Sequence, residues 1–467
     1  MNESSQKDLN ISARSFLTAI IVIFALMTAS YALTLVIPGG AYQRIPDANG
    51  NLIIDTVGGF SFVDGGIPFW KWLLSPILVL GASGSGTLIA VIIFLLVIGG
   101  IFSALERCRL MEYMLNRLTL RFGGMRYQLM VVIAFFFMAL GAMIGSFEEC
   151  VPLVPIVVAL AVKLGWDPLT GVGMSLLAVG CGFASGVCNP FTVGVAQELA
   201  GLPMFSGAWL RLLSFVLIYS LLLFFLHSYA VKIEKDLSDS SATHDFSADA
   251  RMDKALIAFA SILGSGILLV LCSAFLPALQ DLTMIIVAVM FLIAGITSAL
   301  LAGMRPRELG RAAADGVKSI FPAVIMLLMA SSIKYTLEEA SILDTLLYEA
   351  VYLAQALPKW SVILFIYLIV LVMNFFIPSG SAKAFMLIPL IVPMAQIFGI
   401  STQLCIVAFA FGDGFSNVLY PTNPALLISL GLADVSYSDW FRWSRKFQYA
   451  NLALTSAILL FGLAIGY

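Results

Sequence analysis

Four ionisable side chains lie in segments that are otherwise apolar, and they are the first candidates for chemistry. Glu148 and Glu149 are adjacent, whereas Lys383 and Asp413 stand alone in the second half of the chain. A charge at the centre of a bilayer is costly, so such side chains normally face a cavity, a partner or a substrate. We therefore predict that these four residues contribute to substrate binding.

Two adjacent carboxylates are suited to two kinds of chemistry. If Glu148 and Glu149 are both buried, they titrate as a coupled pair in which one proton is held more tightly. This property suits proton coupling, and the same pair also suits recognition of an ammonium or guanidinium group. Two alternatives for Lys383 stay open: it forms a structural ion pair with one of these glutamates, or it meets a carboxylate of the substrate.

Small polar side chains accompany helix-breaking residues at two places about half a chain apart. Each place has a glycine- and serine-containing motif, then two prolines, then an Asn-Pro pair, first over 145–190 and again over 378–424. Half-helix N-termini favour anions and half-helix C-termini favour cations. The predicted substrate-binding residues of this group are Ser146, Asn189, Ser379, Ser381 and Asn423, and the predicted ion-binding residues are Ser185, Asn189, Thr192, Ser416, Asn417 and Thr422. The alternative is that such side chains only pack helices together.

The composition indicates a polytopic membrane protein. Hydrophobic residues make up 61% of the 467 residues and charged residues only 11%, against about a quarter charged in average proteins. The six cysteines show no CxxC spacing, and neither a Walker A nor an HExxH motif occurs. The usual signatures of ATP-driven pumping and zinc proteolysis are therefore missing. We expect no catalytic residues, no metal site and no cofactor, with sodium ion or a proton as the coupling ion.

The fold class that we predict is all-α, with about nine full membrane crossings of roughly 20 mainly apolar residues each. The expected crossings are 15–37, 86–104, 168–198, 209–231, 255–276, 283–302, 319–336, 403–431 and 448–466. Of these, 168–198 and 403–431 are expected to be broken helices. Two further segments, 127–164 and 360–399, resemble paired half-helices, each with a motif at its centre.

The positive-inside rule decides how the paired half-helices are placed. If both are re-entrant hairpins and the N-terminus is cytoplasmic, most Lys and Arg residues fall on the cytoplasmic side, and those left outside are Arg44, Lys71, Arg211, Lys334 and Lys359. Treating either hairpin as two full crossings would lose this sorting. We therefore predict an inverted repeat of the kind found in transporters, in the bacterial plasma membrane.

Five regions follow from this topology. They are an N-terminal helix and outer loop at 1–85, a first repeat at 86–231, a cytoplasmic linker at 232–254, intervening helices at 255–317 and a second repeat at 318–467. Amphipathic segments at 104–121 and 341–356 precede the two hairpins, where we expect interfacial helices.

The chain also resembles a known carrier family. The run 145–155, the sequences GFAS at 182–185 and FGDGFS at 411–416, and the Asn-Pro-Phe and Tyr-Pro-Thr that follow them resemble the YfcC/DcuC-like carriers of the ion transporter superfamily. The resemblance covers most of the chain. It implies an anaerobic C4-dicarboxylate carrier or an arginine/ornithine-type antiporter, with relatives that work as dimeric elevators. It implies as site residues Glu148, Glu149, Asn189, Ser379, Ser381 and Asp413. Lys383 departs from the family pattern, in which a neutral polar residue is common, and this departure favours a carboxylate on the substrate.

The leading hypothesis is a secondary active transporter of a small carboxylate-bearing solute, either an amino acid such as arginine or ornithine or a C4-dicarboxylate. It would work by alternating access, ion-coupled as a symporter or antiporter or by exchange, as a homodimer in the lipid bilayer and without nucleic acid. The alternatives are a channel and an intramembrane aspartyl-type enzyme. The enzyme alternative rests on Phe411-Gly412-Asp413, which resembles a GxGD signature but lacks its first glycine, and no Tyr-Asp partner motif occurs.

Overall fold

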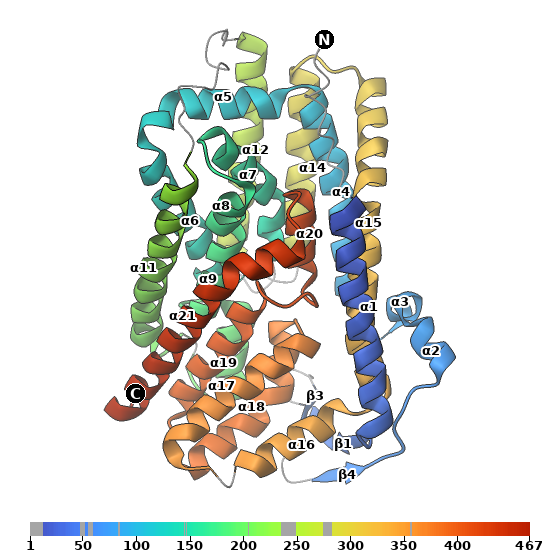
Figure 1. Ribbon diagram of the computed structural model, residues 1–467, viewed down its shortest axis with the longest axis vertical. Coiled ribbons are helices and arrows are strands. Elements are labelled where there is room, and N and C mark those ends of the chain that lie inside the picture. Colours follow the sequence, from blue (N-terminus) through green and yellow to red (C-terminus); the bar gives the residue numbers. More distant parts are fainter. Residues whose placement is uncertain are drawn as a thin grey trace.

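The described part of the chain is built almost entirely from α-helices, as Figure 1 shows. The computed structural model describes residues 13–46, 52–54, 59–82, 85–143, 145, 147–203, 205–234, 249–273, 283–354 and 357–467. Ser146, one of the predicted substrate-binding residues, lies outside the described residues, and so does most of the expected linker at 232–254. The predicted all-α class is confirmed for the main body of the molecule.

Long helices form at every expected uninterrupted crossing. They are α1 (Ala13–Val36), α4 (Ser85–Arg107), α11 (Ala208–Ile233), α12 (Ala250–Ser273), α14 (Thr283–Leu301), α15 (Pro306–Glu339) and α21 (Tyr437–Ile465). The last two begin well before the expected apolar stretches because polar residues cap them further upstream. The Ser436 hydroxyl accepts from the backbone N–H of Asp439 at the start of α21, which satisfies one of the free amides of the first turn.

Nine helices in the described residues are long and apolar enough to cross a membrane, judged by length and composition. The number agrees with the expectation but the set differs. It includes α6 (Arg126–Met143), α17 (Lys359–Phe376) and α18 (Gly380–Ile397), which lie in the expected half-helix pairs. A helix of 18 residues is about 27 Å long. This length is close to the roughly 30 Å thickness of the hydrocarbon core of a bilayer.

Two interrupted helix pairs carry the charged motifs at their tips. In the first pair, α6 is followed by a 3-10 turn, η3 (Glu148–Leu153), and by α7 (Val154–Lys163). In the second pair, three residues separate α17 from α18. The first pair lies in the upper half of the molecule in Figure 1 and the second pair in the lower half. The two tips border one cavity near the middle.

Two broken helices lie beside these pairs. The first consists of α8 (Pro168–Val172), a π-helical turn η4 (Gly173–Leu177), α9 (Ala178–Ser185), a second π-helical turn η5 (Pro190–Gly194) and α10 (Val195–Leu199); the second consists of α19 (Thr402–Ser416) and α20 (Pro424–Leu432). Gly186, with φ of 52°, ends α9 in the left-handed region that glycine adopts without strain. Pro190 and Pro424 then start the next pieces, as expected of a residue that lacks a backbone N–H.

Glycines let the helices of the central region approach closely. Helix α6 packs on α9, which in turn packs on α19. A Cβ at Gly182 would overlap the carbonyl oxygen of Met138 on α6, and a Cβ at Gly414 would overlap the backbone of Ala184 on α9. Small residues at helix contacts of this kind are typical of membrane proteins, where packing rather than hydrophobic burial holds helices together.

The segment expected to be an outer loop contains strands and short helices. Strand β1 (Gly40–Tyr42) pairs antiparallel with β4 (Phe60–Phe62), and β2 (Arg44–Pro46) with β3 (Leu52–Ile54); α2 (Phe69–Leu73) and α3 (Ser75–Leu78) follow. Strand β1 contacts α16 (Leu343–Ala354), and β3 contacts α18. On α16, Asp344 pairs with Arg44 at 2.8 Å and accepts from the Tyr42 N–H at 3.0 Å. Helix α16 and helix α5 (Leu110–Phe122) occupy the places expected for interfacial helices.

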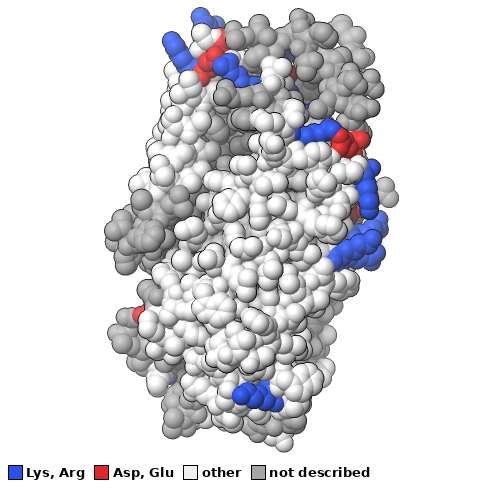
Figure 2. Space-filling model, turned by 90° about the vertical axis from the view of Figure 1, so that its left-hand side faces the viewer, with Lys and Arg blue, Asp and Glu red and all other residues white. Residues whose placement is uncertain are grey.

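The surface of the described residues exposes many large apolar side chains. Phe224 is 72% exposed and Ile257 is 65% exposed. On the face seen in Figure 2, charged side chains gather toward the upper end and along one edge, and a broad white area lies between them and the lower end. Apolar surface of this extent marks contact with a membrane or a partner.

Candidate functional site

A central cavity of about 780 Å³ lies where the two interrupted pairs meet the two broken helices. The predicted site residues that line it are Glu148, Glu149, Thr192, Ser379, Ser381, Asn417, Thr422 and Asn423. Helices α4 and α15 contribute the opposite wall. The volume is in the range of small-molecule sites, about 300 to 1,000 Å³.

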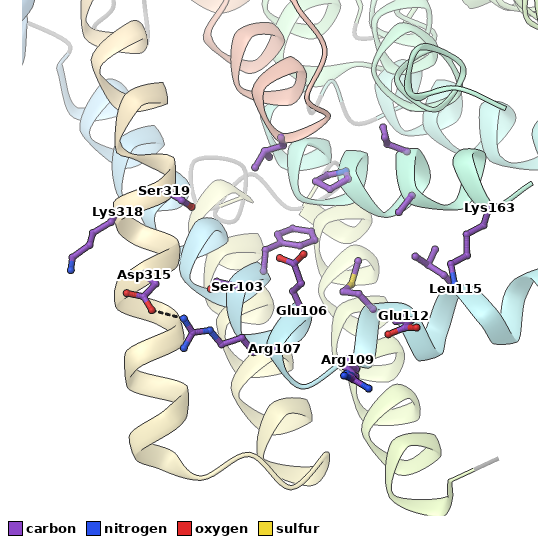
Figure 3. A pocket seen from close by; sticks show the side chains of 16 residues that line it. Ser103, Glu106, Arg107, Arg109, Glu112, Leu115, Lys163, Asp315, Lys318 and Ser319 are labelled. Atoms are coloured by element: carbon purple, nitrogen blue, oxygen red, sulfur yellow. Dashed lines mark hydrogen bonds and ion pairs between the residues drawn. The ribbon is translucent and has the colours of Figure 1, made fainter. Parts of the chain in front are cut away.

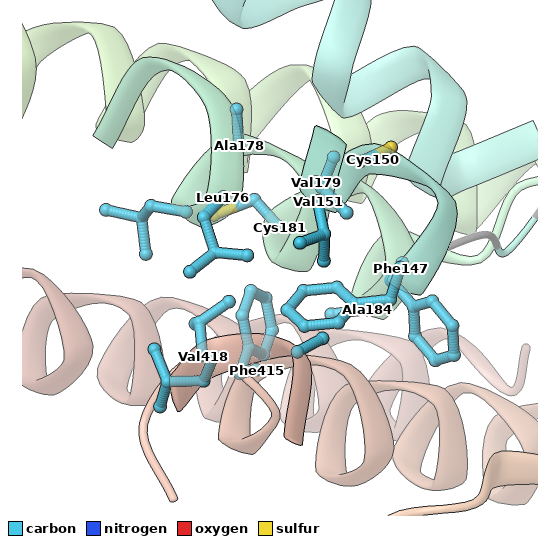
Figure 4. Close-up of a cluster of buried hydrophobic side chains, with 14 of the residues drawn as sticks. Phe147, Cys150, Val151, Leu176, Ala178, Val179, Cys181, Ala184, Phe415 and Val418 are labelled. Carbon is cyan, nitrogen blue, oxygen red and sulfur yellow. The ribbon is translucent and has the colours of Figure 1, made fainter. Parts of the chain in front are cut away.

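The first tip presents two carboxylates to this cavity. Glu148 and Glu149 open the turn η3, and both border the cavity. Gly145, with φ of 75°, turns the chain after α6, and a Cβ there would overlap the side-chain amide of Asn189. Phe147, which is 2% exposed, packs into the apolar cluster beneath the tip (Figure 4). The tip is thus held on both sides, and Glu148 and Glu149 lie at the border of the cavity.

Lys383 pairs with Asp413 and not with a glutamate. Its ammonium forms an ion pair with Asp413 Oδ1 and donates a hydrogen bond to Asn374 Oδ1, and both charged side chains are 0% exposed. An ion pair of Lys383 with Glu148 or Glu149 across the tips is therefore not the arrangement found. Because Asp413 already neutralises its charge, Lys383 gives little support to a carboxylate on the substrate, which its charge alone had favoured in the sequence.

Sequence reasoning misses Asn374, which organises this buried cluster. Its Nδ2 lies 3.1 Å from the carbonyl oxygen of Asp413, 2.6 Å from Ser416 Oγ and 3.0 Å from Asn417 Oδ1. It therefore connects α17 to the end of α19. The feature of the sequence that could have indicated Asn374 is its position as a single amide side chain in the apolar segment just before the second tip.

The two Asn-Pro asparagines have the same local role. Asn423 Oδ1 accepts from the N–H of Leu426 at 3.3 Å, and Asn189 Oδ1 accepts from the N–H of Thr192 at 3.2 Å. Asn423 Nδ2 also donates to Asn417 Oδ1 at 3.0 Å. Each asparagine satisfies a free amide at the start of a half-helix, as capping side chains do. Asn189 is 0% exposed and Asn423 is 3% exposed. Asn423 borders the cavity, whereas Asn189 does not.

The remaining predicted polar residues fall into two groups. The hydroxyls of Ser185 and Ser416 donate to carbonyls of their own helices, Cys181 at 2.8 Å and Gly412 at 2.7 Å. Among the predicted residues, Asp413 Oδ2, Thr192 Oγ1 and Thr422 Oγ1 are buried without a hydrogen-bond partner in the described part of the chain. The role of Thr192 and Thr422 as ion ligands and that of Asp413 in substrate binding stay predictions. No group of three or more His, Cys, Asp or Glu residues that could hold a metal ion occurs in the described ranges.

The charge of the cavity lining is dominated by carboxylates. The charged residues that border it are Glu148, Glu149, Lys334 and Glu338, and Lys334 pairs with Glu338 at 3.3 Å along α15. The N-terminal ends of α18 and α20 also face the cavity, through Gly380 and Ser381 and through Asn423 and Pro424. The lining therefore offers carboxylates at one tip and helix N-termini, which favour anions, at the other.

A second cavity of about 1160 Å³ lies at the opposite end of α4 and α15 and is bounded by α5 and α7 (Figure 3). Its charged residues are Glu106, Arg107, Arg109, Glu112, Lys163, Asp315 and Lys318. Arg107 and Asp315 form an ion pair across it. Charges of both signs suit a water-filled space better than a site for one ligand.

The long apolar helices indicate a multi-pass membrane protein, and a cavity with charged and polar residues lies between them. The model of the C4-dicarboxylate anaerobic carrier family (DcuC) matches residues 16–464, and the chain belongs to that family. This confirms the family resemblance seen in the sequence.

Two curated relatives are similar over most of their length. A protein of Escherichia coli strain K12 with the provisional name basic amino acid antiporter YfcC is 29% identical over 409 residues, which cover 82% of this chain and 80% of that protein. An uncharacterised protein of Haemophilus influenzae is 23% identical, over 96% of each chain. The family and its named relative are transporters, so the protein is a transporter and not an enzyme, and the enzyme alternative is excluded.

Two solved structures are similar at a lower level. The YdaH transporter of Alcanivorax borkumensis has 19% identity and a TM-score of 0.43, over 97% of this chain and 99% of that chain. MtrF of Neisseria gonorrhoeae, described with a class of antimetabolite efflux pumps, has 15% identity and a TM-score of 0.46, over 96% and 95%.

Proposed function

We propose that this carrier moves basic amino acids, with arginine or ornithine as the type, across the plasma membrane by alternating access. The observation that carries the proposal is the charge of the central cavity, whose lining has three carboxylates, Glu148, Glu149 and Glu338, against the single cation Lys334. With Lys383 paired to Asp413, no further cation is contributed from the second tip. A cavity of this charge favours a cationic solute.

The cavity lining has groups suited to both the cationic side chain and the carboxylate of such a solute. Its side-chain ammonium or guanidinium would meet Glu148 and Glu149, because carboxylates bind these groups through charge-assisted hydrogen bonds. Its carboxylate would meet the N-terminal ends of α18 and α20, where backbone amides and the helix dipole favour an anion. The provisional name of the Escherichia coli relative agrees with this choice of solute.

A C4-dicarboxylate is the second candidate, because the family model describes carriers of that class. One carboxylate could occupy the helix N-termini. The other would then lie next to Glu148 and Glu149, and like charges at short range are unfavourable. The observed lining therefore favours the amino acid.

Transport into proteoliposomes distinguishes the two solutes. The full chain is reconstituted, and uptake of labelled arginine, ornithine and succinate is measured. Each uptake is driven in turn by unlabelled solute inside the vesicles, by a sodium gradient and by a pH gradient. Uptake driven by internal arginine would indicate exchange. Transport of succinate without arginine would reject the basic amino acid.

Glutamine substitutions test the two carboxylates in the same assay. Glu148→Gln and Glu149→Gln should each raise the KM for arginine about tenfold to a hundredfold, the size expected for loss of a hydrogen bond to a charged group. Glu349→Gln on the exposed face of α16 is the matched control and should transport normally. Unchanged KM in both tip variants would mean that the acids have only a structural role.

We propose further that the two interrupted pairs are re-entrant hairpins of an inverted repeat and move as part of a dimeric elevator. The sorting of Lys and Arg supports the topology, and the family resemblance supports the dimer. The pairs α6–α7 and α17–α18 would move past α4 and α15, which border both cavities. Native mass spectrometry of the purified carrier tests the dimer, and a purely monomeric protein would contradict it.

A further inference from the structure

The pair Lys383 and Asp413 has no role in the proposed recognition of substrate. The ammonium is held by Asp413 Oδ1 and Asn374 Oδ1, and neither charged side chain is exposed. Asp413 Oδ2 is buried and has no hydrogen-bond partner among the described residues. A Cβ at Gly380 would lie 2.7 Å from this oxygen. The cluster is therefore a pocket of oxygen atoms with one cation in it, directly behind the second tip.

The electrostatic field at the end of α19, and not that of α18, stabilises the Lys383 ammonium at this position. Lys383 lies in the first turns of α18, where a positive charge is opposed by the helix dipole. Asp413 lies in the last turn of α19. The C-terminal end of a helix carries partial negative charge and favours cations, and half-helix ends of this kind hold coupling ions in transporters. The ammonium thus occupies a place suited to a free cation.

The first half of the chain has none of the three polar members of this cluster. With Ser146 aligned on Ser379, Cys150 falls at the position of Lys383 and Gly141 at that of Asn374; with Gly182 aligned on Gly414, Cys181 falls at that of Asp413. Cys150 and Cys181 are buried in an apolar cluster (Figure 4). In this alignment all three positions therefore differ between the two halves.

Packing does not require a charge pair at this place. A buried ion pair contributes little to stability on balance, because removing both charges from water costs as much as their attraction returns. In the first half the aligned positions Cys150 and Cys181 are buried without any charge. The charges in the second half therefore call for an explanation in terms of ion binding.

We propose that the Lys383 ammonium is a tethered cation that fills a cation site formed by Asp413, Asn374 and the end of α19, and that removal of the lysine side chain opens this site to Na⁺. The native protein then binds no sodium ion here. The inference concerns ion binding alone and stands independently of which solute is carried.

Truncation of the lysine should convert the site. Lys383→Ala removes the ammonium and most of the side chain, and leaves space for an ion and a water beside the Asp413 carboxylate. A buried carboxylate without a cation is strongly unfavourable. Carboxylate and amide oxygens at a half-helix end are suitable ligands for Na⁺. Binding of Na⁺ to the folded state alone would then stabilise the variant in proportion to its concentration over the Kd.

The experiment is thermal unfolding of the purified full chain in NaCl, with choline chloride keeping ionic strength constant. We expect the Tm of Lys383→Ala to rise with Na⁺ in a saturable way and by more than the Tm of the native protein. The matched control is Lys383→Ala combined with Asp413→Asn, which lacks the carboxylate and should respond no more than the native protein.

Two outcomes would overturn the proposal. One is a Tm of Lys383→Ala that is the same in Na⁺ and choline; the other is an equal response in the native protein or in the control. If Lys383→Ala does not fold in either salt, Lys383→Gln, which fills more of the space, is measured in the same way and the same criteria apply.

Discussion

At the scale of single residues, the central question is how a charge pair is tolerated out of contact with water. Lys383 and Asp413 are each 0% exposed, and each is the counter-charge of the other. Asn374 bonds both of them, through its Oδ1 to the ammonium and through its Nδ2 to the Asp413 carbonyl. The ammonium thus has a second hydrogen-bond acceptor besides Asp413, whereas among the described residues the Asp413 carboxylate is bonded through Oδ1 to Lys383 alone. The arrangement depends on all three residues.

Removal of one charge should therefore cost much more than removal of both. Asp413→Asn leaves the Lys383 ammonium buried without a carboxylate, and we expect a loss of stability of about 3 to 5 kcal/mol. The combined variant Lys383→Met with Asp413→Leu replaces the pair by apolar side chains and should be close to the native protein. Thermal unfolding in detergent measures both. Equal stability of the single and the combined variant would show that the two charges do not form a pair.

At the scale of helices, glycine decides how closely the first interrupted pair lies on the first broken helix. A Cβ at Gly182 on α9 would overlap the carbonyl oxygen of Met138 on α6, and one at Gly141 on α6 would overlap that of Val179 on α9. Both obstacles are backbone, which cannot move aside as a side chain can. The contact of α6 with α9 thus holds the first tip over the cavity.

Gly182→Ala should separate these helices. We expect a cost of about 1 to 3 kcal/mol from overpacking, together with weaker transport because the first tip shifts. Gly310→Ala is the control: Gly310 lies in α15, and a Cβ there would meet no atom within 4 Å. In a helix interior this change should be neutral or stabilising by up to about 1 kcal/mol. Thermal unfolding and arginine uptake measure the two variants, and equal behaviour would contradict the packing argument.

The helices could be predicted from the sequence far better than the contacts between them. The apolar stretches and the Asn-Pro pairs place α9, α10, α19 and α20 because hydrophobic length and proline act locally. The strands β1 and β4 were missed because their three-residue pairing is set by contact with α16, far away in the chain. The partner of Lys383 was missed for the same reason: Asp413 lies on another element, and the pairing depends on how α18 and α19 pack.

At the scale of the whole molecule, two separate cavities lie along α4 and α15, one near each end. The central cavity borders Ser85 to Val91 at the start of α4 and Lys334 to Glu338 near the end of α15. The second cavity borders Arg107 at the other end of α4 and Asp315 near the start of α15. A solute released from the tips toward the second cavity would cross between these two helices and the pair α6–α7. This route requires that the two interrupted pairs open toward opposite sides of the membrane.

Labelling of single cysteines from each side tests that requirement. Met125 lies at the base of the first pair and is 47% exposed, and Lys359 is exposed at the base of the second pair. In a background without the native cysteines, Met125→Cys should react with an impermeant maleimide only from the cytoplasmic side and Lys359→Cys only from outside. This is the result expected if the proposed hairpins enter from opposite faces with most Lys and Arg residues on the cytoplasmic side. Phe224→Cys, on a face of α11 that would contact lipid, is the control and should react slowly from both sides. Reaction of Met125→Cys and Lys359→Cys from the same side would mean that one interrupted pair crosses the membrane completely, and the inverted repeat would then be wrong.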